Sequence, residues 1–331
     1  MPTPREHFLQ TLAGARPTPI PWGEHGMDCQ VIGKAFGVTF DPIPGTPPDW
    51  EACRAIIERT KRINALTGGA VVSIPRYFTM APRIRKPDNS GELTDEASLG
   101  KLVFVKFTPA HWDTVKRIVD AKGEYAVSAE ISLGIGHIWQ TMDLMAFAVA
   151  TVENPGLIRT ILERYTAWTC EAVENCRRIG VDLIWSFDDF AFGTGLVYSP
   201  SFFREMVLPY ARRVAAAIRG PWVFHSDGNY MEVLDDIAGL GMSAINPVEP
   251  GSMDIPEIRR RHPRLTLIGN VLVDVLGRGT PQQARDEVDR VYRELGGTGP
   301  FLPASSNSVP EWAKPENVRA MLDRHRELAG T

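Results

Sequence analysis

The segment His225-Ser226-Asp227-Gly228, followed later by Glu249, contains residue types that suit a metal site. Residues i and i+2 of a strand point to the same face, so His225 and Asp227 are expected to converge, and Glu249 would arrive from the next strand. One imidazole and two carboxylates form a ligand set for zinc or another divalent cation. The alternative is that His225 is an ordinary hydrogen-bonded side chain and Asp227-Gly228 only a turn.

Eight short apolar runs, each ending in polar residues before a helical stretch, would have to position these side chains. They span residues 19–25, 71–76, 125–130, 182–189, 222–227, 243–249, 265–270 and 301–307. This alternation of strands and helices predicts a single (β/α)8 barrel, an α/β fold whose chemistry lies on loops at the carboxyl ends of the strands. The polar residues expected at that end are Glu24, His25, Arg76, Glu130, Asp188, Asp189, His225, Asp227, Glu249, Asn270, Ser305 and Asn307.

Two adjacent carboxylates, Asp188 and Asp189, lie within an aromatic run. Its aromatic members are Trp185, Phe187, Phe190 and Phe192. A carboxylate among rings suits a pocket for a flat, apolar substrate with a polar handle, and either Asp could also handle protons there. The alternative is that one Asp caps a helix above an aromatic core.

The other polar residues near the strand ends are expected to bind substrate. Glu130 would face the barrel axis or the mouth, where a buried carboxylate needs a partner. The position of His25 at the end of the first run favours a functional role, although it could equally be a packed polar residue. Asn270 is expected to position the substrate through its amide. The predicted substrate-binding residues are Glu24, His25, Arg76, Glu130, Phe187, Phe190, Phe192, Tyr230, Asn270 and Asn307.

Two segments extend the simple barrel pattern. Residues 5–15 are expected to form a short helix ahead of the first strand, an N-terminal helical cap. The segment 77–124 is too long for a simple connection, and long excursions on the catalytic face often carry function. We therefore expect 77–124 to cover the barrel mouth within a single domain spanning residues 1–331.

Composition excludes several classes of partner. The 331-residue chain is 44% hydrophobic and 23% charged with a net charge of −4, which describes a globular protein and gives no reason to expect nucleic acid or an anionic membrane surface. No apolar stretch is long enough to span a bilayer, and residues 1–16 have no signal-peptide core. The four cysteines form no CxxC pair, so we expect idle thiols in a reducing cytoplasm.

The ordered motifs of the carboxyl-terminal half point to a family. They are SPSFFREMVLPYARRV (199–214), FHSDGNYMEVLDDIAGLGMSAINPVEP (224–250), LIGNVLVDVLGRGTPQQARDEV (267–288) and PASSNSVPEWAKPENVRAML (303–322). This stretch, over a third of the chain, resembles the uroporphyrinogen decarboxylase-like superfamily and in particular its methyltransferase branch. A weaker similarity continues upstream through residues 144–180. The resemblance implies a (β/α)8 barrel.

The resemblance also implies a metal site, with one departure. Methyl-transferring members hold zinc with a His-x-Cys, a later Glu and a Cys near the last strand. The corresponding positions here are His225, Asp227, Glu249, and Ser306 or Asn307. Both thiolates are therefore replaced. Soft sulfur ligands suit the activation of a thiol, whereas a His, Asp and Glu set is harder and favours oxygen chemistry.

The decarboxylase branch proper is a poorer match. Its amino-terminal motif, of the type PxWxMRQAGRY, supplies arginines for the acidic side chains of a porphyrin, but residues 19–33 here read PIPWGEHGMDCQVIG. Arg76, Arg83 and Arg85 are the nearby cations, and a substrate with many carboxylates would need several such partners. Porphyrinogen decarboxylation is not expected.

The sequence therefore predicts a methyltransferase of the O-demethylase type. A small methoxylated donor, such as an aromatic ether, would pass its methyl group to a corrinoid carried by a separate protein. A divalent metal, with zinc as the first candidate, held by His225, Glu249 and Asp227 would polarise the donor oxygen. The chain has no DxHxxG cobalamin-binding signature; its one DxH is Asp323-Arg324-His325. The alternatives are a lyase or decarboxylase acting on a small carboxylic acid, and a small-molecule-binding barrel without chemistry.

Overall fold

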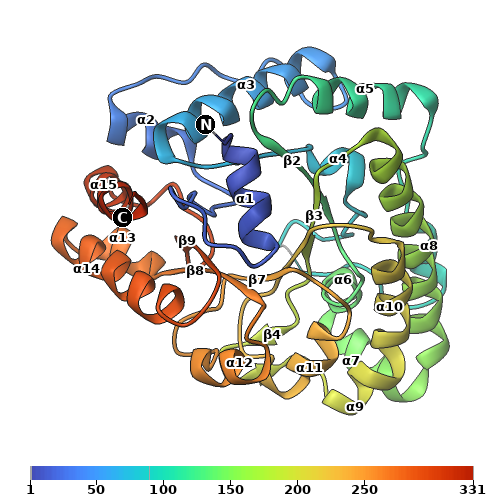
Figure 1. Cartoon of the computed structure of the whole chain (residues 1–331). Helices are drawn as coiled ribbons and strands as arrows, with labels where there is room; N and C mark the ends of the chain where they lie inside the picture. Colours follow the sequence, from blue (N-terminus) through green and yellow to red (C-terminus); the bar gives the residue numbers. More distant parts are fainter. Residues whose placement is uncertain (1, 89, 331) are drawn as a thin grey trace.

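Seven parallel strands form the sheet at the centre of the protein. The computed structural model describes residues 2–88 and 90–330. The strands are β1 (Val71–Ser73), β2 (Ala126–Ile131), β3 (Leu183–Phe187), β6 (Trp222–His225), β7 (Ala244–Asn246), β8 (Thr266–Val271) and β9 (Phe301–Ser305). They pair in sequence order, and helices surround the curled sheet (Figure 1). The prediction of an α/β fold with consecutive parallel strands is confirmed for seven of the eight runs.

The expected first strand, residues 19–25, is not a regular strand. Its residue Trp22 forms a single parallel bridge with Gly69, just ahead of β1, and the Trp22 amide donates to Gly68 O at 2.9 Å. The Gly23 amide donates to Pro303 O of β9 at 2.8 Å, so the segment contacts both edges of the sheet. Pro19 and Pro21 lack the amide protons that a regular ladder requires, which explains why this first run does not form a regular strand.

The inner face of the curled sheet contains a separate apolar cluster. In β3, Leu183, Trp185 and Phe187 alternate into it, as the two-residue period of a strand requires. Phe8 of helix α1 (Pro4–Leu12) packs into the same cluster, and Thr266 Oγ1 at the start of β8 donates to Thr11 O at 2.8 Å. The leading helix is therefore present and lies at the amino ends of the strands, opposite the predicted site (Figure 1).

The remaining elements follow the strands in turn. Before β1 lie α2 (Cys29–Phe36) and α3 (Trp50–Thr67). Between β1 and β2 are α4 (Arg76–Thr79), a 3-10 turn (Ala97–Lys101) and α5 (Pro109–Asp120). β2 is followed by α6 (His137–Thr141), α7 (Leu144–Glu153) and α8 (Pro155–Ile179), and β3 by the β4–β5 hairpin (Ala191–Phe192, Gly195–Leu196), α9 (Pro200–Phe202), a π-helical turn (Phe203–Val207) and α10 (Leu208–Ala217). Later come a 3-10 turn (Met231–Val233), α11 (Leu234–Ala238), α12 (Ile255–Arg261), α13 (Val273–Arg278), α14 (Pro281–Val291), a π-helical turn (Tyr292–Gly296) and α15 (Pro315–Ala329).

The long excursion 77–124 packs mainly against the side of the protein formed by α8. Trp168 Nε1 of α8 donates to Val105 O at 2.9 Å, and Tyr165 OH donates to Pro82 O at 2.6 Å. Leu93 forms a bridge with Met142, which ties the excursion to the loop after β2. These contacts bury apolar side chains of the excursion in the main core rather than in a second one. Within the described residues, no helix is both long and apolar enough to cross a membrane.

Candidate functional site

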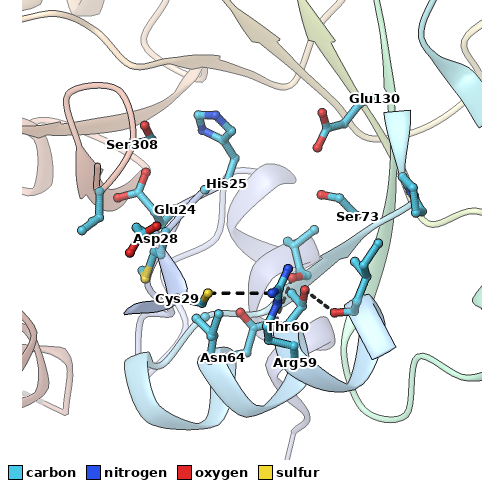
Figure 2. A pocket seen from close by; sticks show the side chains of 18 of the residues that line it. Glu24, His25, Asp28, Cys29, Arg59, Thr60, Asn64, Ser73, Glu130 and Ser308 are labelled. Carbon is cyan, nitrogen blue, oxygen red and sulfur yellow. Dashed lines mark hydrogen bonds between the residues drawn. The ribbon is translucent and has the colours of Figure 1, made fainter. Parts of the chain in front are cut away.

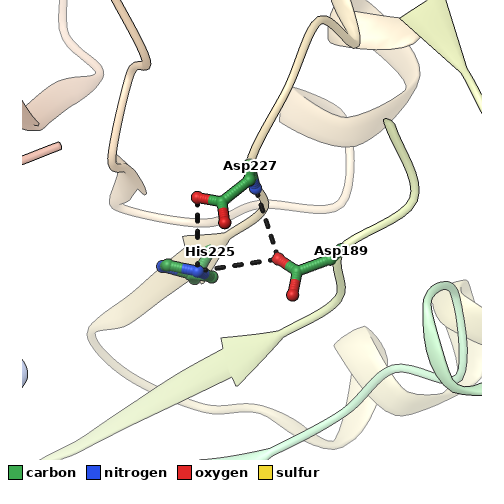
Figure 3. A group of neighbouring side chains, drawn as sticks. All are labelled: Asp189, His225 and Asp227. Atoms are coloured by element: carbon green, nitrogen blue, oxygen red, sulfur yellow. Dashed lines mark hydrogen bonds and ion pairs between the residues drawn. The ribbon is translucent and has the colours of Figure 1, made fainter. Parts of the chain in front are cut away.

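Asp189, His225 and Asp227 come together at the carboxyl ends of β3 and β6. Their ligand atoms all lie within 4.8 Å of one another. Asp189 Oδ1 is 3.6 Å and Asp227 Oδ1 3.8 Å from Nε2 of His225, and the Asp227 amide donates to Asp189 Oδ1 at 3.3 Å (Figure 3). The register explains this convergence, because Phe187 of β3 pairs with His225 of β6 and each Asp follows two residues later.

Asn246 of β7 sets the orientation of the His225 ring. Its Oδ1 lies 2.6 Å from His225 Nδ1, while its Nδ2 donates to Ile268 O at 3.4 Å. An amide oxygen can only accept, so Nδ1 carries a proton and donates, and in the neutral ring Nε2 presents its lone pair toward the two carboxylates. A second partner of this kind is typical of metal-binding histidines. The sequence analysis did not identify Asn246 as a site residue. It could have been found as a polar residue in an otherwise apolar strand, two positions after Ala244 and therefore on the same inward-facing side.

The Asp227 carboxylate is only half satisfied by the protein. Its Oδ2 accepts from Asn307 Nδ2 at 2.7 Å. Its Oδ1 is buried and has no hydrogen-bond partner among the described residues. The pKa of Asp227 is raised to about 6, chiefly by burial; His225 opposes the rise, and nearby Asp189 and Glu249 contribute to it. An orphaned carboxylate oxygen facing an imidazole lone pair and a second carboxylate fits a cation.

Glu249 lies beside this group without joining it. Its Oε2 accepts from the Gly228 amide at 2.8 Å and so holds the turn that follows Asp227. Gly228 has a positive φ of 81°, and a Cβ there would lie 2.5 Å from Ala191 O of the β4–β5 hairpin. The structure thus places Asp189, rather than Glu249, with His225 and Asp227.

The two adjacent aspartates at the end of β3 point in different directions. Asp188 is fully buried, and its carboxylate accepts from Ser132 Oγ at 2.7 Å and from the Leu133 amide at 2.9 Å. Burial raises the pKa of Asp188 to about 6, while these hydrogen bonds oppose the rise. Asp188 therefore anchors the loop after β2, and Asp189 is left to face His225.

His25 and Phe187 form the apolar wall of the mouth. The His25 ring lies 5.2 Å from that of His225 and 5.1 Å from that of Phe187, centroid to centroid. Burial holds the pKa of His25 well below its usual value, so the ring is neutral, and its buried Nδ1 has no partner in the described part of the chain. Arg76 lies 4.8 Å over Phe187 and donates from Nε to Glu130 Oε2 at 2.5 Å. Arg76 is thus the partner that the buried Glu130 was expected to need.

Glu24 ties the amino-terminal segment to the last strand. Its Oε2 accepts from the Ser305 amide at 2.8 Å and its Oε1 from Ser305 Oγ at 3.1 Å. Burial raises the pKa of Glu24 to about 7, and the Ser305 hydrogen bonds oppose that rise. A cavity of about 590 Å³ adjoins this residue and extends from the mouth toward α2 and α3 (Figure 2).

Four predicted substrate-binding residues are engaged in other contacts or exposed. Phe190 and Tyr230 are fully buried and stack in one aromatic cluster, with centroids 5.8 Å apart, because the chain turns outward after Asp189. Asn270 donates to Val248 O and accepts from Arg290 Nη1 at 3.1 Å, so it faces α14. Phe192 lies on the hairpin and is 56% exposed.

Residues 69–328 match the uroporphyrinogen decarboxylase family. The chain belongs to this family. The resemblance inferred from the sequence is confirmed, and family membership supports an enzymatic role. No curated protein sequence matches the chain significantly.

Solved structures share the fold at low sequence identity. A methyltransferase from Methanosarcina mazei has 16% identity and a TM-score of 0.71 over 99% of each chain. A putative vitamin-B12-independent methionine synthase from Listeria monocytogenes has 10% identity and a TM-score of 0.55, covering 95% of this chain and 98% of that one. A B12-independent methionine synthase from Shewanella sp. W3-18-1 has 10% identity and a TM-score of 0.56, covering 95% and 96%. At these identities the likeness shows the fold alone.

Proposed function

We propose that this protein is a methyltransferase that moves a methyl group from a small methoxylated donor to a corrinoid carried by a separate protein. The observation that carries the proposal is the convergence of Asp189, His225 and Asp227 at one end of a sheet whose fold is shared with a methyltransferase. The family resemblance of the sequence implies a metal at that end of the strands. The family and the fold support this class of reaction; the donor and partner are our proposal.

The residues fit a divalent cation such as zinc. Asp189, His225 and Asp227 would hold it, and the orphaned Oδ1 of Asp227 would gain a partner. Glu249 would support the site by holding the turn at Gly228 instead of binding the ion. Bound there, a divalent cation supplies Lewis-acid polarisation of an oxygen. One imidazole and two carboxylates lack the thiolates that favour sulfur substrates, which supports an oxygen donor.

The neighbouring side chains supply binding and orientation. In methyl transfer the methyl–oxygen bond breaks and its electron pair stays on the oxygen, so the leaving oxygen needs a compensating donor or charge. The neutral His25 ring lies beside His225 and lines the cavity, where a ring N–H would donate a hydrogen bond to that oxygen. Phe187 would pack against the apolar part of the donor, and the Arg76–Glu130 pair borders the same space.

Two measurements test the proposal. Chelator-free protein is analysed for metal before and after incubation with zinc, and His225→Ala serves as the comparison. Zinc-loaded protein is then mixed with reduced cobalamin and a methoxylated aromatic, and the formation of methylcobalamin is followed by absorbance. We expect uptake of one ion and methyl transfer in the wild type, and neither in His225→Ala. A wild type that takes up no ion when zinc, cobalt or iron is supplied would contradict the proposal.

A decarboxylase of a small acid is the second candidate. Family membership favours it, and the Glu24 carboxyl, whose pKa is raised to about 7 by burial, lines the cavity at the mouth and has a pKa suited to proton transfer near neutral pH. Release of carbon dioxide from a small acid without methyl transfer would select this alternative.

A further inference from the structure

We propose that the cavity beside the mouth binds a carboxylate group of the substrate, with Arg59 as its counter-charge. This inference rests on the proposed function and narrows it, because the methyl donor would then be a small methoxylated acid. Arg59 belongs neither to the sequence motifs nor to the metal group formed by Asp189, His225 and Asp227, and it lies on α3, the helix that precedes β1.

The cavity has the position and size for such a ligand. Its volume of about 590 Å³ falls within the range of small-molecule sites. Figure 2 shows His25 and Glu130 at one end and Arg59 and Thr60 of α3 at the other. The His25 end of the cavity lies beside the metal group, because His25 lines the cavity and its ring is 5.2 Å from that of His225. A molecule in this cavity would therefore have one end at His25, next to the metal group, and the other at Arg59.

The carboxylates that line the cavity already have partners. Glu24 accepts from the Ser305 amide and hydroxyl. Asp28 Oδ1 accepts from the amides of Gln30 and Val31 at 2.9 Å each, which caps the start of α2. Glu130 is paired with Arg76 at 2.5 Å.

Two arginines line the cavity, and among the described residues Arg76 is paired with Glu130 whereas Arg59 has no acidic partner. It is half-buried, and its contact in the described part of the chain is Nη1 to Cys29 Sγ at 3.8 Å. A thiol is a weak acceptor, and a guanidinium presents five donors in a planar fork that matches a carboxylate. Arg54 on the same helix, by contrast, forms an ion pair with Glu51 at 2.6 Å. A partly desolvated guanidinium at the end of a cavity is thus available for an anion.

Equilibrium titration of the full-length, zinc-loaded protein tests the proposal. The probes are 4-methoxybenzoate and the uncharged 4-methoxybenzamide, which have similar shapes. We expect the wild type to bind the acid at least about tenfold more tightly than the amide. Arg59→Met should lose that preference, whereas Arg54→Met, which removes a charge from the exposed face of the same helix, should keep it.

A metal-bound carboxylate would give a different pattern. The preference for the acid should persist in His225→Ala if Arg59 causes it, and should vanish there if the metal causes it. Failure of the wild type to distinguish acid from amide, or an equal preference in Arg59→Met, overturns the proposal. Circular dichroism checks that the variants are folded. Methylcobalamin formation is scored separately: transfer without the Arg59 effect rejects the carboxylate site alone, and the Arg59 effect without transfer rejects only the proposed reaction.

Discussion

Asn246 Oδ1 accepts a hydrogen bond from His225 Nδ1 at 2.6 Å, and the two residues are register partners on the neighbouring strands β6 and β7. Because the amide also donates to Ile268 O, it cannot turn over without losing both contacts. The imidazole therefore has one tautomer and one orientation, with Nε2 facing Asp189 and Asp227.

Removal of this partner should weaken metal binding without removing a ligand. Asn246→Ala is expected to lower zinc affinity by about 10- to 100-fold, the usual effect of losing a hydrogen bond to a metal-bound histidine. Competition with a chromophoric chelator measures the affinity. Asn175→Ala, on the exposed face of α8, is the matched control and should leave the affinity unchanged. Equal affinity in Asn246→Ala and the wild type would show that the ring does not bind the ion.

Metal affinity should depend on pH through Asp227. Its pKa, raised by burial to about 6, means that a proton competes with the cation below that pH. Zinc affinity is therefore expected to be nearly constant above pH 7 and to fall about tenfold per pH unit below about 6 on account of this carboxyl. Asp227→Asn should bind zinc more weakly at every pH and show a shallower dependence. The same slope in both proteins would exclude Asp227 as the titrating ligand.

Replacement of the two adjacent aspartates should separate stability from metal binding. Asp188→Asn is expected to destabilise the protein by about 1–3 kcal/mol, because buried amides of the loop after β2 lose a charged acceptor. Asp189→Asn should leave stability nearly unchanged and reduce zinc affinity by at least about tenfold, since its side chain is 38% exposed and faces His225. Denaturant unfolding and chelator competition on both variants decide this. The reverse pattern would mean that the two side chains have been assigned to the wrong roles.

Two phenylalanines of the aromatic run, Phe190 and Phe192, should likewise differ in how much they contribute to stability. Phe190→Ala is expected to cost about 3–5 kcal/mol, because its ring is fully buried among other rings. Phe192→Ala should change stability by no more than about 0.5 kcal/mol, as its ring is 56% exposed on the hairpin. Thermal or denaturant unfolding measures both. A stable Phe190→Ala variant with weaker donor binding would restore Phe190 to the substrate pocket.

Local periodicity was enough to predict much of the framework. The alternation of apolar runs with helical stretches predicted eight parallel strands, and seven of them are present in their sequence order. The two-residue period of a strand predicted that His225 and Asp227 share a face, and their atoms indeed lie 3.8 Å apart. Such features depend only on neighbours along the chain, so the sequence by itself determined them. The first run was the exception, since its prolines break the ladder that its apolar residues suggested.

Only the tertiary structure decided which other residues surround His225. Three acidic residues follow the two strands that flank β6: Asp188 and Asp189 after β3, and Glu249 after β7. Their spacing in the sequence does not show which of them lies closest to His225. The register of β3 against β6 brings Asp189 to the imidazole. Glu249 instead accepts a hydrogen bond from the Gly228 amide, and Asp188 accepts one from the Leu133 amide in the loop after β2. The same holds for Arg59, whose place in the cavity depends on how α3 packs beside β1. These outcomes depend on contacts between segments far apart in sequence, for which a single sequence carries no periodic signal.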